Sequence, residues 1–467
     1  MSKLLKNFIA KPKARHIAVT LIAKNGLGDW ASKQKDAVAA QVAEQGFSAS
    51  GARICVIRDA RGAVSKVFVR ISDPLHAEDL AAGVDGIRAN FSAAFLKKTS
   101  FEIKGLKAKD AEAAFIGWGL AHYAFDRYKS VDQAALPLLW HKDVDKKRVK
   151  AYLEAVTLVR DLINIPANDL GPDEMEAAAK DLADAHKAKI RVIKGAKLEK
   201  DFPLIHTVGK ASPRAPRLLD LTWGKAKDPM LTLVGKGVVF DTGGLDLKPS
   251  QYMRLMKKDM GGAAHALAFA SLVMALKIPV RLRVLVPCVE NAVGGAAFRP
   301  GDVIRSRKGL TVENTNTDAE GRLILADALT LGSEEKPDLI IDFATLTGSA
   351  RAALGQDIPA MFCNDDAIGA DLQARSMAAQ DPLWQMPLWD DYERHIKSPI
   401  ADVVNSAGLP GDLIYSALFL QKFLEGSPNW VHLDLFAWES NGKAGRSKGG
   451  SEMSLRALLS LIEARYG

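Results

Sequence analysis

The chain has 467 residues, 48% of them apolar and 25% charged, and its formal net charge is +8. This length predicts two or three domains, and the balanced composition excludes a disordered, fibrous or solenoid protein. Three widely spaced cysteines, Cys55, Cys288 and Cys363, argue against a disulfide framework or a thiolate metal site and are typical of a reducing cytoplasm. The basic N-terminus lacks the apolar core of a signal peptide, and no apolar run approaches the roughly 20 residues of a membrane span. We therefore expect a cytoplasmic protein that does not enter a membrane.

The positive charge is concentrated in residues 1–150, which hold 26 Lys and Arg against 15 Asp and Glu, whereas the remainder holds 37 against 40. Such a surplus is compatible with nucleic-acid binding. A lysine-rich solvated surface is the simpler interpretation, because this region has no dense Arg/Lys block interleaved with aromatic residues.

The N-terminal region alternates strand and helix patterns and predicts a small α/β domain over residues 1–140. Its expected strands lie at 14–22, 52–58 and 65–71, and its expected helices at 33–45 and 108–125. A longer helical pattern over 144–163 ends before Pro166 and Pro172. We therefore expect a connecting helix within 141–165 and a larger domain over 166–467.

The larger region also alternates strands and helices, which predicts an α/β domain with a mostly parallel central sheet flanked by helices. The expected strands are near-continuous apolar runs, as in sheets covered on both faces. They lie at 230–240, 280–287, 338–345 and 358–363, with helices at 261–277 and about 320–334. Ligand sites in such sheets lie at the carboxyl ends of the strands.

Four carboxylates collect at these strand ends and helix starts: Asp241, Asp259, Asp318 and Glu320. The last two belong to 316-NTDAEGRL-323, a polar turn between an apolar run and a helix that both read as buried. Carboxylates brought together repel one another and raise their pKa values unless cations compensate. Two divalent ions about 3.5–4 Å apart are a common solution and form a hydrolytic centre.

Each feature also has a simpler interpretation. Asp259 or Asp318 alone would serve as a helix N-cap, worth about 1 kcal/mol. The glycines around Lys236 lack the spacing of a phosphate-binding loop, and His265 lies inside a helix pattern, where packing is the expected role. A dinuclear phosphoesterase would explain the carboxylates but gives Lys236 no role. The co-occurrence of these features on one predicted rim favours a metal site.

Three segments carry a resemblance to a known family. VGKGVVFDTGG, KKDMGGAA and NTDAEGRLILADAL resemble the leucyl aminopeptidase (cytosol aminopeptidase) family, and the last matches its signature. The resemblance runs with gaps from Asn164 through ATLTGSA at 344–350 to HLDLFAW at 432–438 and covers little of residues 1–140.

The resemblance implies a metal-dependent aminopeptidase that removes N-terminal, leucine-like residues from peptides. Two divalent ions, Mn or Zn, would be held by the four carboxylates and by Lys236 as a neutral amine, whose pKa must then fall far below about 10.4. Lys248 matches the catalytic lysine and would remain charged to stabilise the oxyanion.

The resemblance also implies the nucleophile, its base and the pocket. The nucleophile would be a water bridging the two ions, with bicarbonate as general base. That anion would be held by Arg322, which suits a planar anion, and by the amides around Gly321 and Leu346. Met256 and Thr345 match positions that line the cleft for the first side chain, and family membership implies a homohexamer.

Several segments depart from the family pattern. Asp246 stands where a small residue is usual, and residues 410–413 and 449–455 differ from the expected sequences beside the pocket. An altered side-chain preference is therefore an open alternative. A second alternative is an architectural DNA-binding role through the basic N-terminal domain.

Overall fold

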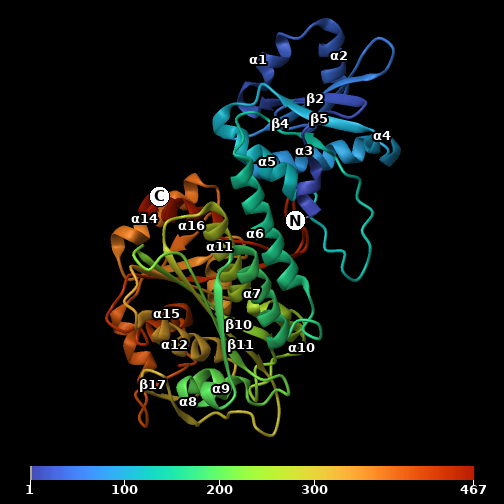
Figure 1. Cartoon of the computed structure of the whole chain (residues 1–467). Helices are drawn as coiled ribbons and strands as arrows, with labels where there is room; N and C mark the ends of the chain where they lie inside the picture. Colours follow the sequence, from blue (N-terminus) through green and yellow to red (C-terminus); the bar gives the residue numbers. More distant parts are fainter. Residues whose placement is uncertain (1–2) are drawn as a thin grey trace. The chain divides into compact units, whose positions relative to one another are not determined.

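The structure is a computed structural model that describes residues 3–467, and it divides into two compact units. Unit 1 comprises residues 1–157 and 439–448, and unit 2 comprises 158–438 and 449–467. The boundary falls within the long helix α6 (Lys146–Asn164), inside the segment expected to connect two domains. Both units mix helices with sheets, which confirms the predicted two-domain α/β class (Figure 1).

Unit 1 contains a six-stranded sheet in the order β1-β6-β5-β2-β4-β3. Neighbouring strands are parallel except β3 and β4. The strands are β1 (Phe8–Ile9), β2 (Arg15–Ala23), β3 (Ile54–Arg58), β4 (Val64–Ile71), β5 (Thr99–Lys104) and β6 (Leu138–Leu139). The α-helices are α1 (Leu27–Ser32), α2 (Asp36–Glu44), α3 (Ala77–Asn90), α4 (Ala93–Lys97) and α5 (Ala111–Leu120), with short 3₁₀ turns at Lys3–Asn7, Lys24–Gly26 and Ala108–Asp110.

Unit 2 is built on a larger, mostly parallel sheet in the order β16-β15-β18-β14-β9-β11-β8-β7, with β10 paired to β11. Its strands are β7 (Lys189–Lys194), β8 (Arg217–Trp223), β9 (Met230–Gly235), β10 (Gly237–Asp241), β11 (Arg281–Asn291), β14 (Leu339–Ala344), β15 (Ala360–Cys363), β16 (Trp384–Gln385) and β18 (Trp430–Asp434). Antiparallel neighbours occur only towards its two edges. Smaller sheets are formed by β12 (Val303–Arg305), β13 (Thr311–Glu313) and β17 (Val403–Val404), and by β19 (Trp438–Glu439) and β20 (Gly449–Gly450).

Helices cover both faces of the large sheet. α11 (Gly261–Leu276) contacts β9 and β14 and packs against α7 (Pro172–His186), whereas α12 (Glu320–Ser333) contacts β9 and β11 and packs against α15 (Asp412–Gln421). Figure 1 shows α7 and α11 on one face and α12 and α15 on the other. The remaining helices are α8 (Ala196–Asp201), α9 (Pro203–Gly209), α10 (Ser250–Met253), α13 (Gly348–Leu354), α14 (Asp366–Ala378) and α16 (Leu455–Tyr466), with 3₁₀ turns η4 (Met256–Met260) and η5 (Asp390–Ile396).

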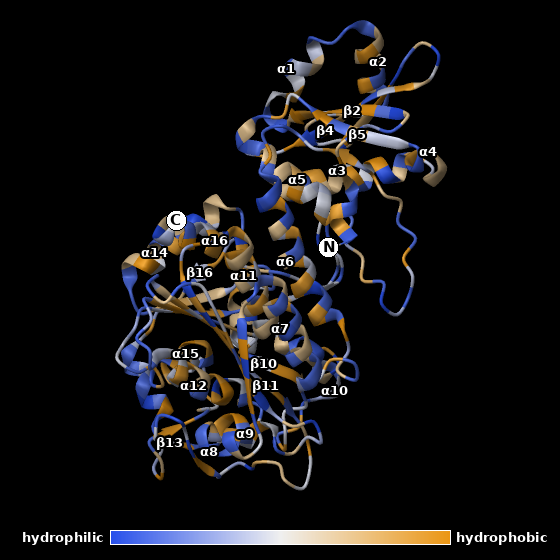
Figure 2. Ribbon diagram, in the orientation of Figure 1, coloured by the Kyte–Doolittle hydropathy of each residue, from blue (hydrophilic) through white to orange (hydrophobic). Residues whose placement is uncertain are grey.

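The central strands are apolar because both of their faces are buried. Every residue of β9 and of β14 is buried, and Figure 2 shows the hydrophobic colour along β10 and β11. The segment Met256–Leu276 is long and apolar enough to cross a bilayer, but 83% of an apolar 18-residue stretch within it is buried inside the fold, as expected for a core helix. Hydrophobic burial of this kind is the main stabilising contribution in a domain of this size.

The strand predicted over 230–240 is two strands, and the break between them positions the site. β9 pairs with the first half of β11 and β10 with the second half. At the break, the Lys236 N–H donates to the Phe343 carbonyl at 2.9 Å, and the Lys236 carbonyl accepts from the Ala263 N–H at 2.8 Å. The sequence pattern shows only that residues 230–240 form an apolar run. It could not predict that the pairing with β11 is divided between two strands at Lys236.

Candidate metal centre

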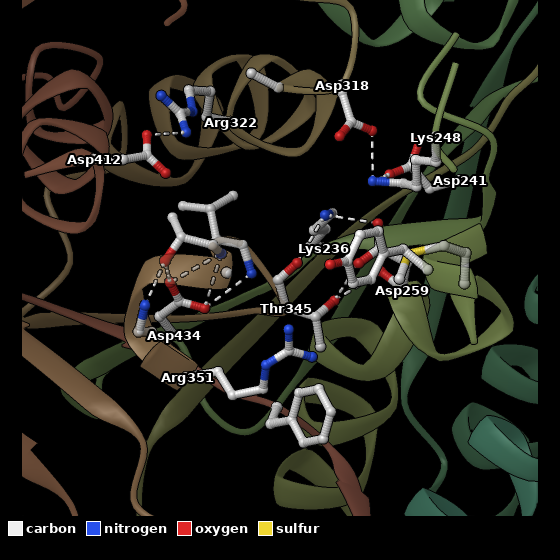
Figure 3. Close-up of a pocket in the computed structure, with 18 of the residues that line it drawn as sticks. Lys236, Asp241, Lys248, Asp259, Asp318, Arg322, Thr345, Arg351, Asp412 and Asp434 are labelled. Atoms are coloured by element: carbon white, nitrogen blue, oxygen red, sulfur yellow. Dashed lines mark hydrogen bonds and ion pairs between the residues drawn. The ribbon is translucent and has the colours of Figure 1, made fainter. Parts of the chain in front are cut away.

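The predicted carboxylates converge where β10 ends and where α11 and α12 begin. Asp241 ends β10, Asp259 lies in η4 just before α11, and Glu320 is the first residue of α12. Ligand atoms from these three side chains lie within 4.8 Å of one another, and each residue is at most 3% exposed. Asp318 reaches the same place from the preceding loop, with its side chain 32% exposed (Figure 3).

Two lysines lie among these carboxylates. The Lys236 Nζ lies 2.7 Å from Asp259 Oδ2 and 3.1 Å from Glu320 Oε1, and it donates to the Thr345 carbonyl at 2.8 Å. The Lys248 Nζ lies 2.8 Å from Asp241 Oδ2 and 2.5 Å from Asp318 Oδ1. The structure therefore brings together all four carboxylates and both lysines that the sequence singled out.

Burial and mutual repulsion perturb the acids unequally. Burial and then the charge of Asp241 raise the pKa of Glu320 well above its usual value. The same two causes raise the pKa of Asp318 to about 6. Burial would also raise the pKa of Asp259, but Lys236 leads the positive charges that lower it instead. The cluster therefore strongly favours additional positive charge.

The lysines respond in the opposite direction. Burial alone would lower the pKa of Lys236, but Asp259 and the other nearby carboxylates outweigh it and raise the pKa above its usual value. The same competition raises the pKa of Lys248. A bound divalent cation would take the place of the lysine charge among the carboxylates and would lower the pKa of Lys236. The neutral amine that a metal bond requires therefore depends on the presence of the ion.

The donor set fits hard divalent cations. Glu320 Oε2 is buried and accepts no hydrogen bond within residues 3–467, while Asp259 Oδ2 and Asp318 Oδ1 face lysines without an aligned hydrogen bond. Buried carboxylate oxygens without hydrogen bonds are costly, and metal ligation satisfies them. An all-oxygen cluster with one amine suits magnesium, manganese or zinc.

The sequence did not reveal the residues that hold the cluster in place. The buried Asn291 donates from Nδ2 to Asp241 Oδ1 at 2.8 Å and to the Thr317 carbonyl at 3.1 Å. Asp246 accepts from the Thr317 N–H at 2.7 Å and fixes the loop that carries Asp318. Asp246, a departure from the family pattern, therefore has a structural role beside the site. The hydrogen-bonded partners are 26 to 71 positions apart along the chain, so no local motif joins them.

The simpler interpretations of individual residues are wrong for Asp259 and Asp318. Neither acts as an N-cap, because Met260 precedes α11, Ala319 precedes α12, and neither helix has a side-chain cap. The expectation for His265 agrees with its contacts. Its ring is fully buried, with Nδ1 2.6 Å from the Gly261 carbonyl and Nε2 accepting from the Met453 N–H at 3.0 Å.

The predicted anion site has one donor without a partner, and its other donors from Arg322 and Leu346 are already engaged. Arg322 donates through Nη1 to the Asn405 carbonyl at 2.6 Å and through Nη2 to Asp412 Oδ1 at 3.0 Å. Its buried Nε has no hydrogen-bond partner among the described residues. The Leu346 N–H donates to Asp434 Oδ1 at 2.9 Å, so it would have to change partner to bind an anion. Asp412 belongs to a segment that departs from the family pattern.

The centre opens into a pocket of about 550 Å³. Met256 and Thr345 line it, as predicted, and the Thr345 hydroxyl donates to Asp259 Oδ1 at 2.8 Å. Lys258, Arg351 and Phe436 also line it and were not predicted. A concave site with convergent charged groups is the usual form of an active site.

Comparisons with known proteins agree with this geometry. Residues 157–459 match the cytosol aminopeptidase family, catalytic domain, and residues 17–139 match the M17 aminopeptidase N-terminal domain. The chain is 41% identical over 363 residues to a probable cytosol aminopeptidase of Syntrophotalea carbinolica, covering 74% of this chain and 73% of that protein. It is 37% identical over 398 residues to Peptidase B of Pectobacterium carotovorum, covering 81% and 91%.

Solved structures resemble the chain along nearly its full length. The cytosol aminopeptidase from Coxiella burnetii has a TM-score of 0.92 and 41% identity, covering 99% of this chain and 100% of that one. The bottromycin maturation enzyme BotP in complex with Mn has a TM-score of 0.85 and 32% identity, covering 97% and 99%. These matches confirm the resemblance inferred from the three motifs.

Proposed function

The chain belongs to the cytosol aminopeptidase (M17) family, and from this premise we propose that it is a metal-dependent aminopeptidase with a dinuclear centre. The observation that carries the proposal is the buried cluster of Asp241, Asp259 and Glu320, in which Asp259 Oδ2 and both Glu320 oxygens accept no hydrogen bond from the described residues. The Mn complex of the related BotP supports a divalent ion.

We propose that Lys236 and the four carboxylates hold two divalent ions, Mn or Zn. When bound, these ions would supply positive charge that polarises a peptide carbonyl and lowers the pKa of water. The site lines a pocket, and a pocket suits the end of a peptide better than its middle. Release of N-terminal residues is the activity that this arrangement supports.

Two cationic side chains have proposed roles in the reaction. Lys248 lines the pocket with its side chain 13% exposed, and it would donate to the oxygen that becomes negative when the peptide carbonyl is attacked. Arg322 would hold a bicarbonate through its unpartnered Nε, with the amide of Gly321 and, after a change of partner, that of Leu346. Held by these residues, a bicarbonate would supply a general base beside the site.

Further properties follow from family membership as proposals. Met256 and Thr345 would contact the N-terminal side chain, which the resemblance predicts to be leucine-like. We also propose a cytoplasmic homohexamer that acts on peptides. The DNA-binding alternative rests on the basic surplus in residues 1–150, and neither the site nor the comparisons add support for it.

The proposal is tested with one leucyl peptide in two forms, one with a free α-amine and one N-acetylated. We expect the Mn-loaded protein to release leucine from the first peptide alone, as detected by mass spectrometry. Cleavage of both peptides would contradict an aminopeptidase, as would failure of the metal-loaded protein to release an N-terminal residue from any of a panel of free-amine peptides.

A further inference from the structure

One wall of the pocket is cationic. The Lys258 Nζ lies 5.2 Å from the centre of the Phe436 ring, and the Arg351 guanidinium carbon lies 5.0 Å from the same centre. Both cationic groups therefore lie near the ring of Phe436, and all three side chains line the pocket. Attraction to the ring compensates such charges only in part.

Neither cation has an acidic partner in the part of the chain that the structure describes. Among residues 3–467, the side chains of Lys258 and Arg351 make no ion pair and no hydrogen bond, although Lys258 is only 6% exposed. This contrasts with Lys236 and Lys248, each of which lies against two carboxylates. A buried, unpaired ammonium is costly, because it has lost water without gaining an anion.

The carboxylate that lines this part of the pocket is already engaged. Asp434 accepts from the Leu346 N–H at 2.9 Å through Oδ1, and from the Thr347 N–H at 3.0 Å and hydroxyl at 2.6 Å through Oδ2. These bonds fix its orientation towards the loop after β14. An anion for Lys258 and Arg351 must therefore come from a molecule that enters the pocket.

The cationic wall lies beside the carboxylate cluster. Lys258 directly precedes Asp259 in η4, and the Thr345 hydroxyl donates to Asp259 Oδ1. Figure 3 shows Arg351 extending into the pocket below Thr345, on the side away from Lys248 and Asp318. A peptide whose N-terminal residue is bound at the cluster would therefore direct the side chain of that residue towards Lys258 and Arg351.

We propose that this wall selects peptides whose N-terminal residue is acidic, glutamate or aspartate, rather than leucine. The inference rests on the proposed aminopeptidase function, which places the N-terminal residue in this pocket. A guanidinium binds a carboxylate through two parallel hydrogen bonds, and Lys258 adds a second positive charge. The side-chain carboxylate would supply the missing partner of both cations.

The test compares glutamyl and glutaminyl p-nitroanilides, since these side chains match in size and differ in charge. We expect the Mn-loaded enzyme to have a kcat/KM at least about tenfold higher for glutamyl than for glutaminyl, and higher for glutamyl than for leucyl. In Arg351→Met and Lys258→Met, the glutamyl to glutaminyl ratio should fall by about tenfold. The ratio is insensitive to a general loss of active protein, because both substrates lose equally.

Arg299→Met is the matched control, because this exposed arginine pairs with Asp302 outside the pocket and should leave the ratio unchanged. Arg351→Glu should lower the glutamyl to glutaminyl ratio below that of Arg351→Met. It should also improve hydrolysis of lysyl p-nitroanilide, whose side chain is positively charged. A wild-type ratio near one, or a ratio unaffected by both methionine variants, overturns the proposal while leaving the aminopeptidase intact. No release from any free-amine substrate overturns the aminopeptidase itself.

Discussion

At the scale of single residues, position rather than residue type decides what each charge does. Lys236 and Lys248 each lie against two carboxylates, whereas Lys258, only one residue from Asp259, has no acidic partner among the described residues. Among the four carboxylates, Glu320 has the least compensation for its burial. It is 1% exposed, and neither of its oxygens accepts a hydrogen bond from the described residues. Such a group destabilises the metal-free fold and favours metal binding.

Glu320→Gln should stabilise the metal-free protein at alkaline pH. Burial and then Asp241 raise the pKa of Glu320 in the folded state, so the folded state holds this proton more tightly than the unfolded chain does. The free energy of unfolding of the metal-free wild type therefore falls as pH rises above the usual value of 4.5. Thermal unfolding near pH 8 should show a melting temperature a few degrees higher in the variant, on the order of 2–4 °C per kcal/mol.

The gain should shrink towards pH 5, where Glu320 is protonated in the folded wild type, and it should reverse when Mn is added. A variant that is less stable than wild type near pH 8 without metal would contradict this assignment of the charge.

Lys236→Met and Lys248→Met should fail in different ways. Lys236 contacts Asp259 and Glu320 deep in the cluster, so its loss should weaken metal binding, measured by calorimetric titration with Mn. Loss of Lys248 should lower kcat by about 10²–10³ in the metal-saturated enzyme, as for removal of an oxyanion donor. Equal metal affinity in Lys236→Met and wild type would remove that residue from the ligand set.

At the scale of elements, the site depends on the close approach of the α12 N-terminus to the break between β9 and β10. A Cβ on Gly321 would lie 2.5 Å from Lys236 Cε and 2.7 Å from its Nζ. Glycine therefore lets Glu320 and Lys236 share one cavity. The backbone at this position is helical, so the requirement is one of space and not of conformation.

Gly321→Ala should lower activity at least tenfold through displacement of Lys236, even though alanine has the higher intrinsic helix propensity by about 1 kcal/mol. Hydrolysis by the metal-loaded variant checks this, with circular dichroism to verify the fold. Gly28→Ala in α1 is the matched control, because a Cβ there would contact nothing within 4 Å, and it should retain activity. Full activity in Gly321→Ala would contradict the close approach.

Element types were predictable where periodicity was strong, and element limits were not. The helices at 261–277 and 320–334 lie within a residue of their expected limits, because glycine or acidic turns precede long apolar patterns. The helix expected at 33–45 is α2, which begins three residues later at Asp36, and the short helix α1 before it was not expected. The strand at 230–240 divides at Lys236 because of bonds to Phe343 and Ala263, which lie in other segments of the chain.

In the molecule as a whole, sequence motifs predicted the carboxylates and lysines of the centre. The other residues of the site are brought to it only by the fold. Asn291, Arg351 and Phe436 each enter the site from a separate segment. Arg351 follows 344–350 and Phe436 lies within 432–438, two segments that carry the family resemblance, but no pattern there predicted that these side chains line the pocket. The departures from the family pattern did carry information. Asp412 is an ion-pair partner of Arg322, and Asp246 fixes the Asp318 loop.

We propose that two divalent ions in this carboxylate cluster make the chain an aminopeptidase. The most direct measurement is hydrolysis of a free-amine p-nitroanilide by metal-stripped protein during stepwise addition of Mn, with bound metal counted by mass spectrometry. We predict no hydrolysis without metal and full activity at two ions per chain, with no recovery in Glu320→Ala. Hydrolysis by the metal-stripped protein, or full activity in Glu320→Ala, would contradict a metal-dependent aminopeptidase with this cluster as its centre.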